Sequence, residues 1–393
     1  MKLPKVGYSL AEQAFASGFT FLLFVAAARL LSQSALERYT ALFTLNQCLS
    51  FFLFGLVLLP MASATGETAG KQLGISIVML GGLVLSFAVV SPLMMHYFRS
   101  LREIFTFELW VLSLTFFASQ CLYESARWLT IRLRSVRAAL AVTSTRFALF
   151  FTGIALVGSE HLDAANFVIT QILVNSAAMI GFTFALRGVA EEVRLALPDR
   201  SAIGHFSNFG TALANFLTNL TTVAFVDHGL GPAGLAAFQS LRSATNPIGV
   251  LSQVIDNHFS AYLARTGSGF EGRDHIVRYA LGAAAVLVIL AFSFGQQIVR
   301  LFFGEVLVGN WVLLPLLLMA ALAHALTRPV FVTWRLEGNT RALNRYSLLL
   351  IVAALPALVL LGWAGSTLTM ITLFALLPAT ALIVHQLQSA EKA

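Results

Sequence analysis

Charged and sulfhydryl side chains are scarce in this sequence of 393 residues. Only 11% of the residues are charged, 58% are hydrophobic, and the mean hydropathy is +0.81. Water-soluble domains of this length do not have such a composition. The two cysteines, Cys48 and Cys121, both lie inside apolar stretches. This placement argues against a disulfide framework and against a cysteine-based metal site.

The sequence also lacks the motifs that carry enzyme chemistry. It contains no glycine-rich phosphate loop ending in lysine, no His-Glu-x-x-His and no Gly-x-Ser-x-Gly. It has no long polar segment that could form a catalytic domain outside a membrane. We therefore expect neither an enzyme nor an ATP-driven pump, and we expect no cofactor and no metal ion.

What the sequence has instead is a succession of long apolar stretches. A membrane-spanning helix needs roughly 20 apolar residues, and the chain offers about a dozen such stretches. They predict a polytopic all-α membrane protein with spans near residues 8–31, 38–62, 72–97, 104–126, 138–158, 162–187, 205–226, 233–263, 276–303, 308–334, 345–364 and 366–388.

The distribution of basic residues predicts the orientation of these spans. If the N-terminus is cytoplasmic, most of the 25 lysine and arginine residues fall in cytoplasmic segments, as the positive-inside rule requires. The run "RWLTIRLRSVR" between the fourth and fifth spans is the strongest anchor. We expect both termini in the cytoplasm, and the net charge of +7 to reflect topology and attraction to anionic lipids rather than nucleic-acid binding.

The chain divides near its midpoint, at its longest polar break, "RGVAEEVRLALPDRSAIGH". We predict an N-terminal six-helix lobe at 1–190, a cytoplasmic linker at 191–204 and a C-terminal six-helix lobe at 205–393. A shift of half the chain aligns "SALERYTALFTLNQ" with "AGLAAFQSLRSATN", at low identity. Two halves of six spans would be parallel repeats with a cavity between them.

Several stretches resemble one transporter family. "EQAFASGFTFLLFVAAARLLS", "RYTALFTL" and "LVLLPMAS" are similar to the opening of the polysaccharide transport family, which includes the Wzx-type O-antigen flippases. This family belongs to the multidrug/oligosaccharidyl-lipid/polysaccharide (MOP) exporter superfamily. "LGPAGLAAFQSLRSATNPIGVLSQVIDNHF" and "IVRLFFGEVL" in the second half agree with it. The chain departs from the pattern after "ARLL", where Ser32, Gln33 and Ser34 replace a Gly-Pro-type turn.

The resemblance implies about twelve helices in two lobes, with the first, second, seventh and eighth spans around a central cavity. It implies a secondary transporter of the bacterial cytoplasmic membrane that flips a polyprenyl-(pyro)phosphate-linked saccharide by alternating access, with a proton or a sodium ion as the candidate coupling ion. A polymerase or glycosyltransferases are possible partners. The alternatives are a multidrug or cation antiporter of the same fold, and a scaffold that binds lipid-linked intermediates without moving them.

Three arginines inside or beside predicted spans are candidates for contact with an anionic headgroup. Arg242 lies in the eighth span, five residues before Pro247, and arginine suits bidentate phosphate recognition. Arg146 lies about 12 Å deep in the fifth span, where it either contacts substrate, pairs with Glu124 or reaches back to the headgroups. Arg29 closes the first span and either meets the departing pyrophosphate or lies among the outer headgroups.

Polar side chains recur at helical spacing in the first and seventh spans. Such a face must meet protein or water, so it is predicted either to bind sugar hydroxyls or to bond neighbouring helices. Glu12 is assigned to a capping box with Ser9 at the start of the first span. Asp256 and His258 are possible coupling residues or a solvated helix end. The members of the polar face that we predict to bind substrate are Gln13, Asn208, Thr211, Asn215 and Thr218.

Overall fold

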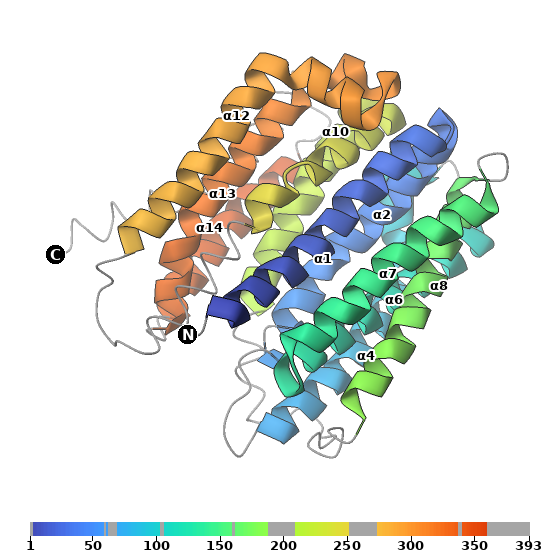
Figure 1. The fold of residues 1–393 in the computed structure, drawn as a ribbon. Coiled ribbons are helices and arrows are strands. Elements are labelled where there is room, and N and C mark those ends of the chain that lie inside the picture. The colour runs from blue at the N-terminus through green and yellow to red at the C-terminus, as the bar shows by residue number, and fades with distance from the viewer. Residues whose placement is uncertain are drawn as a thin grey trace. The chain divides into compact units, whose positions relative to one another are not determined.

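A computed structural model describes residues 3–58, 60–61, 69–102, 106–158, 162–187, 209–250, 273–336 and 340–359 (Figure 1). Within these residues the regular secondary structure is entirely helical. The elements are α1 (Leu3–Leu30), α2 (Gln33–Leu53), the π-helix η1 (Phe54–Leu58), α4 (Ala69–Tyr97), α5 (Arg99–Arg102), α6 (Phe107–Leu133), α7 (Val136–Val157), α8 (Ala164–Leu186), α10 (Phe209–Ser243), α12 (Arg273–Phe303), the 3₁₀-helix η6 (Glu305–Asn310), α13 (Leu313–Leu336) and α14 (Thr340–Val359).

Seven helical stretches among the described residues are long and apolar enough to cross a membrane. They are Ala11–Leu30, Gln33–Leu58, Leu73–His96, Val136–Val157, Ala164–Leu186, Phe209–Ser243 and Ala285–Phe303. The predicted class, an all-helical multi-pass membrane protein, is confirmed. The count of twelve spans and the cytoplasmic termini stay predictions, and the last predicted span, 366–388, lies outside the described residues.

The boundary between the seventh and eighth predicted spans is a break inside α10. Gly231 has a positive φ of 70°, which is outside the helical region, and Pro232 follows it. Glycine tolerates this backbone conformation, and proline is well suited to the first turn of the helical segment that follows. The polar break predicted between residues 226 and 233 is therefore a single non-helical residue.

The residues fall into two compact units by their internal contacts. Unit 1 comprises 1–19 and 30–216, and unit 2 comprises 20–29 and 217–393. α1 is thus divided after Phe19, and α10 is divided after Phe216. The predicted linker, 191–204, lies outside the described residues, so the predicted lobe boundaries stay predictions.

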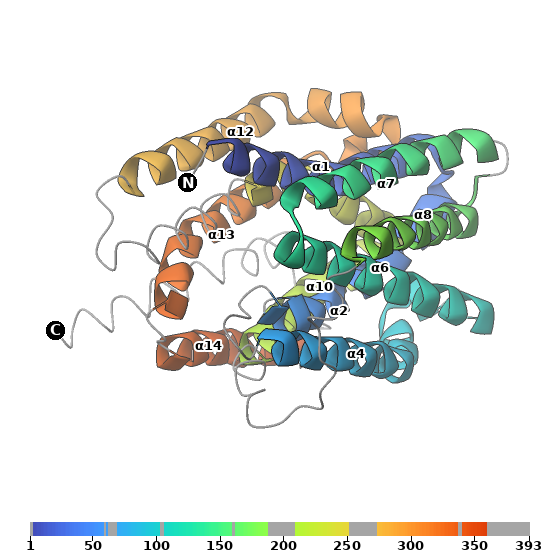
Figure 2. The ribbon, with the colours of Figure 1, turned by 60° about the horizontal axis from the view of Figure 1, so that its bottom comes forward.

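Unit 1 is held together by the packing of α8 against α6 and α7 (Figures 1 and 2). Aromatic rings fill much of its core. The rings of Phe87 and Phe117 stack with centroids 4.0 Å apart, and the Phe167 ring meets those of Tyr39 at 4.8 Å and Phe150 at 5.5 Å. Aromatic pairs at these distances favour one packing arrangement over others. This packing fixes the positions of the helices that carry the charged side chains of unit 1.

Four helices of unit 1 begin at side-chain caps. The oxygens of Ser32, Thr106, Ser135 and Asp163 accept hydrogen bonds from the amides three residues later, at the starts of α2, α6, α7 and α8. Such caps satisfy amides that have no partner within the helix. The connection between α6 and α7 is only Arg134 and Ser135. Most of the predicted basic anchor "RWLTIRLRSVR" is therefore helical rather than loop.

Unit 2 contains α12, α13 and α14, which pack in sequence order (Figure 1). α12 ends at Phe303, and Gly304 leaves the helix with a φ of 84°. The ring of Phe21, from the second part of α1, packs edge-on against Phe302 and Phe303. The end of α12 is therefore covered by α1.

Candidate functional site

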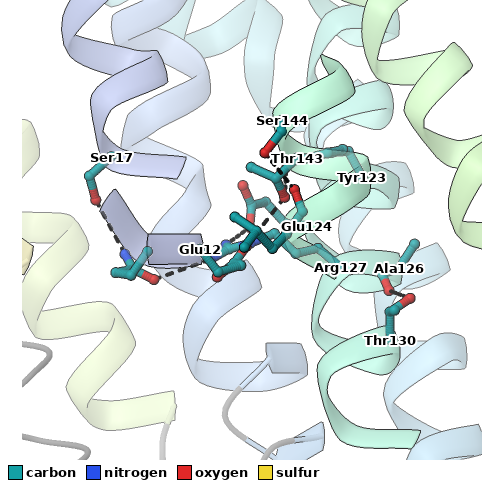
Figure 3. A network of polar contacts seen from close by, with 11 residues as sticks. Glu12, Ser17, Tyr123, Glu124, Ala126, Arg127, Thr130, Thr143 and Ser144 are labelled. Carbon is teal, nitrogen blue, oxygen red and sulfur yellow. Dashed lines mark hydrogen bonds and ion pairs between the residues drawn. The ribbon is translucent and has the colours of Figure 1, made fainter. Parts of the chain in front are cut away.

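Unit 1 encloses a group of charged and neutral polar side chains from α1, α6 and α7 (Figure 3). We call it the buried charge cluster, and its members are Glu12, Gln13, Glu124, Arg127 and Thr143. Arg127 binds Glu12 through Nε–Oε1 at 2.5 Å and Nη2–Oε2 at 2.8 Å, and it binds Glu124 through Nη1–Oε2 at 2.8 Å. Glu12 is 3% exposed and Arg127 is 5% exposed.

Neutral side chains complete this cluster. Arg127 Nη2 also donates to Gln13 Oε1 at 3.1 Å, and Gln13 Nε2 donates to the Ser17 hydroxyl at 3.2 Å. The Thr143 hydroxyl donates to Glu12 Oε1 at 3.3 Å. One buried guanidinium thus meets two carboxylates and an amide, which compensates its loss of hydration.

Two predictions from the sequence are wrong at this cluster. Glu12 is not part of a capping box, because α1 begins at Leu3 and residue 12 lies in its third turn, away from the unpaired first amides. Arg127 is not a cytoplasmic loop residue, because α6 continues to Leu133 and carries it into the core. The ion pair joins residues 115 positions apart, so no local pattern could reveal it.

Arg146 on α7 has a different environment. It is 4% exposed and lies between two rings, with its Cζ 4.1 Å from the centroid of Phe19 and 3.9 Å from that of Tyr123. Its Nε donates to Asn175 Oδ1 at 2.9 Å, and its Nη2 donates to Gln120 Oε1 at 3.4 Å.

The pairing of Arg146 with Glu124 that the sequence suggested is wrong, because Glu124 pairs with Arg127 instead. The alternative of a side chain reaching back to the headgroups is also wrong, since the guanidinium is buried among rings and amides. Among the described residues no carboxylate pairs with Arg146. Its role as a substrate contact stays a prediction.

The two arginines are joined by hydroxyl groups. The Tyr123 hydroxyl lies 3.4 Å from the Thr143 hydroxyl, which donates to Glu12. Tyr123 and Arg127 are four residues apart on α6, and Thr143 and Arg146 are three apart on α7, so each pair shares a helix face. The cluster and the Arg146 environment are therefore consecutive layers of one polar core.

Arg242 is the charged centre of the candidate site in unit 2. Its Nη1 donates to Asn219 Oδ1 at 2.6 Å, and its Cζ lies 6.0 Å from the ring centroid of Phe238. Residues 23 apart in one straight helix would be about 35 Å apart, so the break at Gly231 brings them together. The Arg242 side chain is half-buried, whereas Asn219 is only 7% exposed.

The predicted polar face of the seventh span lies on α10. Thr211, Asn215 and Thr218 are half-buried there. The hydroxyls of Thr221 and Thr222 donate to carbonyls of the same helix, those of Leu217 at 2.7 Å and Thr218 at 2.9 Å. These two hydroxyl protons are thus used inside the helix. Asn208, Asp256 and His258 lie outside the described residues.

Arg29 covers the C-terminal end of α12 within unit 2. Its Nη2 donates to the carbonyls of Arg300, at 3.0 Å, and Leu301, and its Nε donates to Phe302 O at 3.1 Å. These carbonyls belong to the last turn, where a cation also meets the negative end of the helix dipole. The geometry is that of a C-terminal cap, and contact between Arg29 and a headgroup stays a prediction.

Two further buried polar groups escaped the sequence analysis. Asp227 on α10 is completely buried, although it stands in the apolar stretch "VAFVDHGL", where a lone carboxylate was a visible signal. Asn175 on α8 is also completely buried and bonds Ser119 Oγ and Gln120 Oε1, both at 3.2 Å. Within the described part of the chain, no three histidine, cysteine or acidic side chains lie close enough together to hold a metal ion.

No protein-family model matches the sequence, and no curated protein matches it either. Solved structures do resemble the fold. An inward-facing multidrug resistance MATE family transporter of the MOP superfamily aligns over 100% of this chain and 95% of its own, with a TM-score of 0.58 and 15% identity. A MOP superfamily transporter from Pyrococcus furiosus, described as having a binding pocket of reversed polarity, aligns over 99% and 94%, with a TM-score of 0.62 and 14% identity.

The lipid II flippase MurJ, in an inward closed conformation, is similar as well. It aligns over 98% of this chain and 87% of its own, with a TM-score of 0.62 and 14% identity. The chain therefore has the fold of the MOP superfamily transporters. The narrower resemblance to the Wzx-type family stays a prediction.

Proposed function

We propose that this protein is a secondary transporter that flips a lipid-linked oligosaccharide, or a related surface-polysaccharide precursor, across the bacterial cytoplasmic membrane. Its fold is that of transporters and of a lipid II flippase, which supports a transport role without identifying the cargo. A polyprenyl-(pyro)phosphate-linked saccharide presents an anionic, hydroxyl-rich headgroup. Moving it through hydrocarbon requires cations and hydrogen-bonding groups inside the protein.

Arg242 is the observation that carries this proposal. One N–H group of its guanidinium donates to Asn219, and this half-buried cation lies on the helix that the family resemblance assigns to the cavity wall. A guanidinium offers five N–H donors in a planar array that suits phosphate oxygens. We infer that Arg242, in unit 2, holds the phosphate. For the polar face of α10 we infer that the Asn215 amide and the hydroxyls of Thr211 and Thr218 bond sugar hydroxyls.

The antiporter alternative rests on buried carboxylates. A multidrug antiporter needs an acidic group that can exchange an organic cation for protons or sodium. Glu12 lies inside α1 and is buried, in a position that the sequence alone would have dismissed as too close to the span's end. Arg127 already neutralises it through two hydrogen bonds. A cation would have to displace Arg127, so the flippase is the better-supported function.

The test is flipping by the purified protein in liposomes. A labelled polyprenyl-pyrophosphate-linked oligosaccharide is followed with a reagent that reads only headgroups on the outer leaflet. We expect protein-dependent exposure of the headgroup, accelerated by an imposed proton or sodium gradient. Arg242→Ala should reduce the initial rate at least tenfold, and Arg242→Lys should restore only part of it, because an ammonium lacks the planar donor array.

Arg300→Ala is the matched control. Arg300 is an exposed arginine of unit 2, and within the described ranges its side chain pairs with the exposed Glu305 alone, so its removal should leave the flipping rate unchanged. Full activity of Arg242→Ala would remove Arg242 from the site. Gradient-driven efflux of organic cations without flipping would establish the antiporter, and the absence of both activities would favour the scaffold.

A further inference from the structure

Arg146 in unit 1 is buried with an incomplete set of partners. Its guanidinium lies against two aromatic rings, with Cζ 4.1 Å from the ring centroid of Phe19 and 3.9 Å from that of Tyr123. Its polar partners are the side-chain oxygens of Asn175 and Gln120.

The donors of this guanidinium outnumber the acceptors. A guanidinium has five N–H groups, and Arg146 uses one for Asn175 and one for Gln120. The Gln120 oxygen accepts twice, from Arg146 and from Asn175 Nδ2, whereas its own amide N–H groups have no acceptor among the described residues. Nη1 of Arg146 and Nε2 of Gln120 have no acceptor among the described residues, and neither is a fully buried atom, so a ligand can reach these donors. No carboxylate among the described residues pairs with Arg146.

Arg127 is a second buried arginine of unit 1, and its charge is neutralised. It lies one helical turn along α6 from Tyr123 and donates to two carboxylates and one amide oxygen. Both glutamates of the buried charge cluster bind Arg127, so neither is placed to neutralise Arg146. A buried cation without a counter-charge is strongly disfavoured.

We propose that a small inorganic anion of the halide class binds in unit 1 at the edge of the Arg146 guanidinium, with the Gln120 amide as a second donor. A monatomic anion accepts hydrogen bonds from any direction, so the N–H groups of one guanidinium and one side-chain amide can hold it together. The anion would supply the negative charge beside Arg146 that no described side chain supplies. This inference concerns a resident anion and goes beyond the proposed transport of a saccharide.

Bromide provides a direct probe of this site. The purified protein is compared in sodium bromide and in sodium gluconate at equal ionic strength, by thermal unfolding and by the line width of the bromide NMR signal. A ligand that binds only the folded state raises Tm with its concentration, by roughly 3 °C for each tenfold increase above Kd. We expect this rise for the wild type, together with a broadened bromide signal.

Two variants connect the response to Arg146. Arg146→Gln should abolish both the Tm response and the broadening. Gln120→Glu places a carboxylate on the side chain that already accepts from Arg146, so it should raise Tm in gluconate and remove the bromide response. If Arg146→Gln fails to fold, Gln120→Glu still tests whether the bromide response depends on the site at Arg146.

Arg134→Gln is the matched control, since Arg134 also lies in unit 1 but donates to the carbonyls of Ala185 and Arg187. It should keep the full response. Equal Tm of the wild type in bromide and gluconate would overturn the proposal, as would an unchanged response in Gln120→Glu or a lost response in Arg134→Gln. A response to inorganic phosphate but not to bromide would also overturn the halide site, and would return Arg146 to the binding of the substrate phosphate.

Discussion

Arg127 and Arg146 are buried to nearly the same extent in the same lobe, at 5% and 4% exposure, yet their surroundings differ in kind. Arg127 meets two carboxylates, whereas Arg146 meets two amides and two aromatic faces. An arginine that is neutralised within the chain holds helices together. One that is left with neutral partners keeps its charge available for a ligand.

A second contrast separates buried charges from exposed ones. Arg29 and Arg134 donate to the last carbonyls of α12 and α8, where they cap helix ends. Arg300 and Glu305 form an exposed pair, with side chains 56% and 72% exposed. Arginines of this chain thus neutralise carboxylates, lie between aromatic rings, cap helix ends or form exposed ion pairs. The loss in free energy of unfolding when an arginine or its partner is removed should increase with burial and with any charge left without a partner.

The largest effect is expected for Glu12→Ala. The substitution leaves Arg127 buried with a single carboxylate, and breaking one partner of a buried pair typically costs about 3–5 kcal/mol. We expect little folded protein, a markedly lower Tm in detergent and early aggregation. A variant that unfolds at the wild-type temperature would show that Glu124 alone compensates Arg127.

Arg146→Met should be milder than Glu12→Ala. It removes two hydrogen bonds and two ring contacts, but it also removes a buried charge and leaves no carboxylate without a partner. We expect the free energy of unfolding to fall by less than about 2 kcal/mol. A loss equal to that of Glu12→Ala, measured under the same conditions, would erase the distinction between the two arginines.

Arg29→Ala should destabilise the end of α12 locally. Loss of the cap leaves the carbonyls of residues 300–302 without their donor, at a cost of about 1 kcal/mol. The effect should appear as faster amide hydrogen exchange in residues 301–306. The corresponding change in unit 1, Arg134→Ala, should act on the end of α8 and leave residues 301–306 unaffected.

The smallest effect is expected for Glu305→Gln. Its partner, Arg300, is mostly exposed, and exposed ion pairs contribute only about 0–1 kcal/mol. Tm should change by less than about 2 °C. A larger change would mean that this pair contributes more than its exposure indicates.

Much of the fold could be predicted from the sequence, because the bilayer strongly restricts which structures can span it. Hydrocarbon requires long apolar helices, so α7 at 136–157 and α8 at 164–186 lie within a few residues of their predicted spans. The break in α10 at Gly231 lies between residues 226 and 233, where the predicted seventh span ends and the eighth begins. The start of α1 at Leu3 was harder to predict, because a helix can extend beyond its apolar part.

The candidate site was harder to predict from the sequence than the fold. Arg146 and Arg242 were identified as charges in apolar segments, since such charges are costly and visible in any sequence. Their partners were not. Asn175 lies 29 residues from Arg146, and Asn219 lies 23 residues before Arg242 across a break in the chain. Helical spacing predicts only contacts within a few residues.

Amino-acid composition and the lengths of the apolar runs are enough to identify a multi-pass helical membrane protein with a few charged side chains inside its helices. They are enough because the free-energy cost of placing each residue in hydrocarbon is local. Which of these charges neutralise one another depends on the folded structure. Glu12 neutralises Arg127 and not Arg146 because the packing of α1, α6 and α7 sets distances between residues more than a hundred positions apart. Electrostatic energy depends on those distances, and they are absent from the sequence.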